Sequence, residues 1–171
     1  RFDAAALHVK HEMLVDRACG GDRPVVLNTS ATVTIASSAT LNVQTAGRSF
    51  LMQSPPMRNG ALVIDGVLNA SPLPKYDSPT DVVVNVPFAL RRNGTLLVDK
   101  RYRVLLYAPS TSEGRFNVRG TLTLSNGAHR HMPGAVVSGD GTLAIANDAA
   151  LTTCAGTLVD ISRLGVAHAG A

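Results

Sequence analysis

Short runs of alternating apolar and polar residues recur along the whole chain. The segments TVTI at 32–35 and TLNV at 40–43 repeat one Ser-Ala-Thr phrase eight residues apart. A second phrase, Gly-x-Leu-x-apolar or a near relative, recurs more widely and begins at Gly60, Gly66, Gly94, Gly120, Gly141 and Gly156. Alternation with a period of two is typical of strands with one buried face, and glycine permits a tight corner. The pattern therefore predicts short strands separated by tight corners.

Helices are disfavoured over most of the chain. Residues 82–87 and 102–107 are rich in β-branched or aromatic side chains, and Pro or Gly interrupts nearly every helical window. We therefore predict an all-β protein. The first 18 residues fit both a helical and an alternating spacing, and a short N-terminal capping segment there would protect the open end of a stack.

Two all-β architectures compete. The Asn-Gly dipeptides at 59, 93 and 126 suit the hairpins of an antiparallel β-sandwich, whereas recurrence of one strand phrase favours a parallel β-helix. We favour the parallel β-helix, with coils of about 20 residues. Residues 1–171 then form a single domain or a segment of a longer solenoid, and the proline-rich stretch 71–87 is expected to be an irregular loop insertion.

The sequence resembles a known group of proteins in two segments, GALVIDGVLN at 60–69 and GAVVSGDGTLAIANDAALT at 134–152. These are similar to the right-handed parallel β-helix of pectin-lyase-like proteins, autotransporter passengers and other cell-surface β-helical repeats. The resemblance implies a right-handed solenoid and, for pectin-degrading relatives, clustered carboxylates with basic residues on one face. The Gly-His-Gly and Arg-x-Lys phrases of polygalacturonase-type enzymes do not occur in this sequence.

The composition supports narrow coils. Hydrophobic residues make up 45% of the chain but aromatic residues only 4%, with no Trp, so small and branched side chains must fill the interior. The net charge of +4 is too mild for a nucleic-acid footprint, and no apolar run reaches the length of a membrane span. We therefore expect no nucleic-acid partner and no membrane insertion.

The candidate catalytic and metal-binding residues are sparse. The acidic residues of the repeats are not spaced to meet within one strand, although Asp140 and Asp160, about one coil apart, could share a column instead of lying as solvated corner residues. His129 and His131 alternate and would point to one face, but two ligands do not make a stable zinc site, so solvent-facing or corner histidines are favoured. We expect no metal and no cofactor.

Arginines form the main candidate binding surface. Coil stacking could gather them into a face for sulfated or uronic polysaccharides, because guanidinium groups bind carboxylate and sulfate bidentately. The alternative is an ordinary solvated face. The residues are Arg91, Arg92, Arg101, Arg103, Arg115 and Arg119.

Sequons and cysteines bear on the compartment. N-x-S/T sequons make Asn28, Asn69 and Asn93 glycosylation candidates, the middle one weakened by Pro72. Cys19 and Cys154 could pair in a disulfide or be two unrelated thiols.

Taken together, these features favour a non-catalytic structural or adhesive module of a secreted or cell-surface glycoprotein, giving a rigid scaffold for assembly or attachment. Its expected partners are other segments or copies of the same protein, neighbouring surface or filament proteins, or an acidic polysaccharide. The alternative is a polysaccharide-binding or polysaccharide-degrading β-helix, a lyase or hydrolase.

Overall fold

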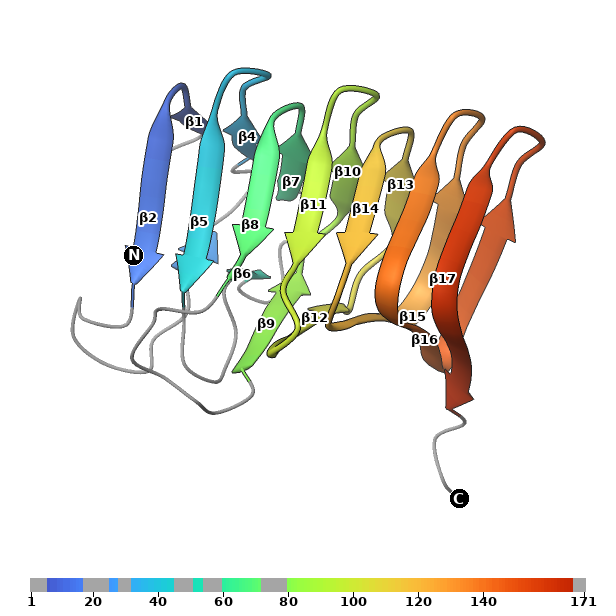
Figure 1. The fold of residues 1–171 in the computed structure, drawn as a ribbon. Coiled ribbons are helices and arrows are strands. Elements are labelled where there is room, and N and C mark those ends of the chain that lie inside the picture. Colours follow the sequence, from blue (N-terminus) through green and yellow to red (C-terminus); the bar gives the residue numbers. More distant parts are fainter. Residues whose placement is uncertain are drawn as a thin grey trace.

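The computed structural model describes residues 6–16, 25–27, 32–44, 51–53, 60–71 and 80–167. These residues contain strands and turns but no helix, and the strands stack as a parallel β-solenoid (Figure 1). The prediction of an all-β parallel solenoid is therefore confirmed. The helical reading of the N-terminal segment is wrong for its described part, where β1 (Ala6–Val9) and β2 (Glu12–Asp16) extend the same ladder.

Each coil contributes strands to three faces, which we call A, B and C in chain order. Face A holds β1, β4 (Thr32–Ile35), β7 (Ala61–Ile64), β10 (Phe88–Leu90) and β13 (Ser110–Ser112). Face B holds β2, β5 (Thr40–Gln44), β8 (Val67–Ala70), β11 (Thr95–Val98) and β14 (Arg115–Val118). Face C holds β3 (Val25–Leu27), β6 (Leu51–Gln53), β9 (Thr80–Asn85) and β12 (Tyr102–Leu106).

The last three strands are long and bend around corners, so each serves more than one face. β15 (Thr121–His131) runs along face C and then face A, and β16 (Val136–Thr153) runs along faces B, C and A. β17 (Leu158–Ala167) lies on β16 along face B and then face C. The described chain therefore ends on face C. This is the last face of a coil, and the next strand in the path would lie on face A.

Every pairing between the described strands is parallel, which excludes the antiparallel sandwich. Two of the three Asn-Gly dipeptides that suggested hairpins lie at corners instead, and Asn59 of the third lies outside the described residues. Asn93 and Gly94 belong to the turn that leads from β10 to β11, and Asn126 and Gly127 adopt positive φ angles of 59° and 87° where β15 bends from face C to face A. Such dipeptides suit any corner that needs a left-handed backbone.

Coil length changes along the solenoid. Thr32 pairs with Ala61, 29 positions later, whereas Thr121 pairs with Thr142, 21 positions later. The expected coil of about 20 residues therefore describes the C-terminal part only. The glycine phrase is irregularly spaced for a related reason, because the copy at Gly94 opens a face-B strand and the copy at Gly120 opens a face-C strand.

Part of the stretch 71–87, where the sequence predicts an irregular loop insertion, is a regular strand. Residues 72–79 lie outside the described residues, but Thr80–Asn85 form β9, which pairs with β12 on face C. Val82 and Val84 point into the core and are fully buried, so the run of β-branched residues wins over the nearby prolines. The strand therefore occupies most of the second half of the predicted loop.

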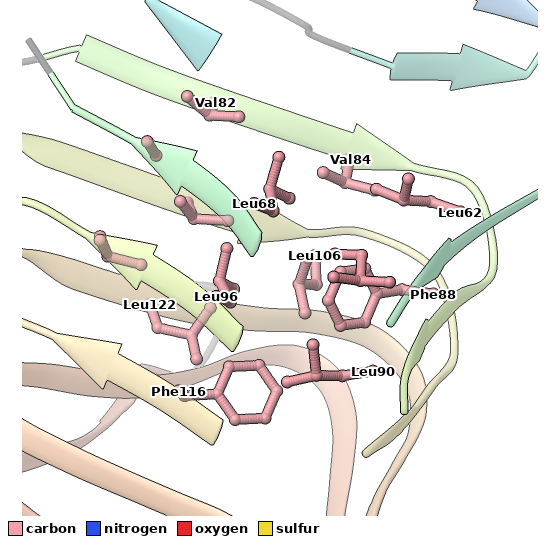
Figure 2. Close-up of a cluster of buried hydrophobic side chains, with 14 of the residues drawn as sticks. Leu62, Leu68, Val82, Val84, Phe88, Leu90, Leu96, Leu106, Phe116 and Leu122 are labelled. Atoms are coloured by element: carbon pink, nitrogen blue, oxygen red, sulfur yellow. The ribbon is translucent and has the colours of Figure 1, made fainter. Parts of the chain in front are cut away.

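Inward side chains form continuous columns that are mainly apolar, with buried serines and histidines in the later coils of face A. Figure 2 shows one such region, in which side chains from faces A, B and C meet at the centre. Leu68, Leu96 and Phe116 succeed one another along face B at consecutive ladder positions, and each is at most 1% exposed. Burying a side chain of this size contributes about 1.5–3 kcal/mol relative to exposure. The low aromatic content is consistent with this narrow interior.

Close stacking of the corners requires glycine at particular positions. A Cβ added at Gly114 would lie 2.4 Å from the carbonyl oxygens of both Arg91 and Gly94, in the turn of the preceding coil. No side chain can be accommodated at that separation without movement of the backbone. Gly94 and Gly120 of the glycine phrase meet carbonyl oxygens of the preceding coil in the same way, so the phrase reflects contact between coils as well as a tight corner.

Candidate functional site

The C-terminal end of the solenoid exposes side chains that elsewhere form the core. Leu164 stands in register with Leu143, and Leu143 with Leu122, in one inward column of face C. Leu122 and Leu143 are fully buried, but Leu164 is 64% exposed. Val166 and Val159 likewise end inward columns and are 64% and 41% exposed. Together with Leu158, at 55%, they form an apolar surface that we call the C-terminal end surface.

Backbone groups are also unpaired at this end. Within the described part of the chain, β17 has a ladder partner, β16, on one edge only (Figure 1). A free edge presents a row of N–H and C=O groups that can pair with another strand. The C-terminal end surface thus combines an apolar patch with a template for strand addition.

The N-terminal end carries the complementary elements. β1 pairs only with β4 and β2 only with β5 among the described strands. Leu7 and Met13 stand at the start of inward columns and are only half-buried, although both pack against the core. We call this region, formed by β1 and β2, the N-terminal end surface.

A shallow groove of about 420 Å³ runs over the start of face A. Its floor is formed by small residues that stand in one outward column at successive coils, Ala61, Pro87, Pro109 and Ala128. Arg130, at its margin, is the only charged residue in the lining. The groove contains no carboxylate pair, so its lining offers no acid and base for glycoside cleavage.

The two alternating histidines lie inside the protein. The sequence correctly predicts that both share one face, but they point inward and are fully buried instead of facing solvent. His129 Nδ1 lies 2.8 Å from Ser110 Oγ, and the His131 ring stacks on Phe116 with centroids 5.3 Å apart. Arg130 between them is exposed, because a guanidinium costs more to bury than a neutral imidazole.

Burial controls the charge of this pair. It lowers the pKa of His131 to about 4, and the neighbouring His129 adds to the effect. Burial also lowers the pKa of His129, partly opposed by backbone contacts with Ser125 and Asn126. Neither ring nitrogen of His131 has a hydrogen-bond partner in the structure, nor does Ser112 Oγ in the same column. Both histidines are therefore neutral at pH 7.

The candidate arginines are distributed over several places. Arg91 and Arg92 are in the turn from face A to face B, and Arg115 begins the face-B strand of the next coil. Arg101 and Arg119 are at corners from face B to face C, and Arg103 points outward from face C. The structure does not bring these six residues into one stripe. Polysaccharide binding by any of them stays a prediction.

Acidic residues accompany some of these arginines. Arg103 Nε and Nη2 donate hydrogen bonds to Oδ1 and Oδ2 of Asp81, and this hydrogen bonding raises the pKa of Arg103. Lys100 Nζ lies 3.4 Å from Asp140 Oδ2 across exposed corners. Asp160 pairs with Ser138, and Asp140 lies in the bulge that follows, so the two aspartates do not share a ladder position. Among the described residues no group of three or more His, Cys, Asp or Glu side chains could hold a metal.

The glycosylation and disulfide candidates differ in their settings. Asn93 is exposed in a turn, whereas Asn69 is half-buried in β8 and its Nδ2 donates to Asn42 Oδ1 at 2.9 Å. Asn28 lies outside the described residues. Cys154 is half-buried in the turn after β16, and Cys19 also lies outside the described residues, so their pairing stays a prediction.

Sequence reasoning anticipates the open ends of a stack but does not locate one at β17, and it misses the groove. The alternation in β17 has the same form as in buried strands, so nothing in the pattern distinguishes an end coil from an internal one. A signal for the groove does exist: Pro87 and Pro109 precede face-A strands, and the following residues, Phe88 and Ser110, are ladder partners. Aligning the coils by these prolines would have placed the small outward residues in one column.

Comparison with known proteins adds no family to this description. No family model, no curated protein and no solved structure matches the chain. No helix in the described part of the chain is long and apolar enough to cross a membrane. The fold itself defines the class of protein, a parallel β-solenoid with an exposed apolar surface at its C-terminal end.

Proposed function

We propose that this chain is a non-catalytic structural or adhesive module of a secreted or cell-surface glycoprotein, a rigid scaffold for assembly or surface attachment. We further propose that it is of the right-handed parallel β-helix type found in pectin-lyase-like proteins and autotransporter passengers. One observation carries the proposal. The inward columns run without interruption through successive coils and are then left uncovered at β17. A solenoid built in this way is stiff along its axis and can be extended at its ends.

The lateral faces of the solenoid are better suited to binding than to catalysis. The groove on face A is lined mainly by small and apolar side chains, and its single charged residue is Arg130. The buried histidines are enclosed by core side chains and cannot meet a polymeric substrate. These features favour binding or attachment through the surface and disfavour cleavage of a substrate. Acidic polysaccharide is the candidate ligand of the exposed arginines.

The test is to incubate the full chain with an acidic polysaccharide such as polygalacturonate, measuring polymer length and protein retention on a polymer-coated surface. We expect polymer length to stay unchanged. Retention without cleavage supports adhesion. If the protein is not retained and the polymer is not cleaved, the result supports a purely structural role. Robust depolymerisation would overturn the proposal in favour of a lyase or hydrolase.

Matched variants locate any retention. Arg91→Gln with Arg92→Gln removes two exposed charges from one turn, whereas Arg103→Gln removes a charge already paired with Asp81. Loss of retention in the first variant and not in the second assigns binding to the turn. Mass spectrometry of Asn28 and Asn93 in native material tests the compartment, since attached glycans require a secretory route.

A further inference from the structure

We infer that the C-terminal end surface binds the N-terminal end surface of a second copy of this chain, so that copies stack head to tail as one continuous solenoid. This inference rests on the proposed scaffold function and names its partner. Three properties of the described strands support stacking: their path, their register and their exposed core residues.

The strand path provides the first argument. In every described coil a face-C segment is followed by a face-A strand, as β9 is followed by β10 and β12 by β13. The second half of β17 lies on face C, and β1 lies on face A. The first described strand of one copy therefore belongs to the face that comes next after the last described strand of another. β2, on face B, then follows in the same order.

The ladder register provides the second argument. Leu7 opens an inward face-A column that passes through Val33 and Leu62 and ends at Leu151. Continuing this column across the junction places Leu7 of the second copy on Leu151 of the first. The face-B column that opens at Met13 ends in the same way at Val159. Both junctions join two apolar side chains, each at an incompletely covered end of the core.

The exposed core provides the third argument. Leu164 and Val166 have lost the cover that Leu122 and Leu124 receive from the next coil. A stacked copy would restore that cover and would pair the free edge of β17 by the same parallel ladder. Such a contact uses two different surfaces, so it does not close on itself and generates open-ended chains of copies.

Complementary end variants test the inference on the full chain. Leu164→Lys charges the C-terminal end surface, and Leu7→Lys charges the N-terminal one. In sedimentation velocity we expect the unmodified protein to form a concentration-dependent series of oligomers and each variant alone to be monomeric. An equal mixture of the two variants should form a 1:1 dimer and nothing larger, because only one intact surface of each kind is then available.

Asn117→Lys is the matched control, since it adds the same charge at an exposed position of an internal coil. It should keep the oligomer series. Circular dichroism confirms that each variant is folded, and Val159→Lys, at the exposed inward end of the face-B column, provides a second C-terminal variant if Leu164→Lys does not fold.

Three results would overturn the inference. A closed dimer that persists in Leu7→Lys shows tail-to-tail association. A monomer whose β17 amides are protected from hydrogen exchange shows that other residues of the same chain cover the end. A monomer with unprotected β17 amides shows that the end stays open. None of these results bears on the polysaccharide test, so the scaffold proposal can survive the loss of head-to-tail stacking.

Discussion

Internal coils and the C-terminal coil present the same side chains in different surroundings. Leu143 and Leu164 are ladder partners in one column, yet the first is fully buried and the second is 64% exposed. The difference lies in the coil that follows: one covers Leu143 and none in the described structure covers Leu164. Burial in a solenoid is thus conferred by the neighbouring coil, and stability approximates a sum of contacts between neighbours.

The largest expected effect comes from shortening two leucine side chains of the same inward column, one in an internal coil and one in the last coil. Leu122→Ala should reduce the free energy of unfolding by about 2–5 kcal/mol, because it opens a cavity among buried side chains. Leu164→Ala should reduce it far less in the monomer, since the side chain is already largely in water. Urea unfolding of both variants at low protein concentration measures the difference. Equal losses would show that the C-terminal end is covered.

The second test adds a methyl group to one glycine of an internal coil and to one glycine of the last coil. Gly114→Ala places a Cβ against two carbonyl oxygens of the preceding turn and should cost about 3 kcal/mol by overpacking. Gly165→Ala, in the last coil, meets no atom within 4 Å and should be close to neutral or slightly stabilising. Thermal unfolding followed by circular dichroism provides the comparison. A neutral Gly114→Ala would show that the corners are not closely stacked.

The sequence predicts the short strands and tight corners well, because alternation and corner glycines are local properties. The alternation of Tyr102, Arg103 and Val104 corresponds to the structure of β12, where Tyr102 and Val104 point inward and Arg103 points outward. Coil length could not be predicted in the same way, since turns between strands vary without disturbing the ladder. Thr32 and Ala61 are partners across a long coil, and no local pattern marks that distance.

The candidate sites were harder to predict, because they depend on which coils are neighbours. Alternation places His129 and His131 on one face but does not say whether that face is inward. Packing decides it, since His131 stacks on Phe116 and Arg130 remains in water. The end surfaces depend on the absence of a neighbour in the described structure, which no property of β17 itself encodes.

The smallest of the three effects concerns the polar part of the otherwise apolar core. The pKa of His131 is about 4 in the folded protein, against an ordinary value of 6.5, so the unfolded chain binds more protons between these pH values. Stability should be complete above pH 6.5 and should fall as the pH is lowered toward 4, with a loss of about 2 kcal/mol at pH 5 from this residue. His131→Phe keeps the ring stacked on Phe116 and removes the titrating group, so its stability should depend less steeply on pH. Urea unfolding at pH 7 and pH 5 measures both slopes. If the variant retains the full acid sensitivity, the buried histidine is not its source, and the polar core is no weaker in acid than the aliphatic coils before it.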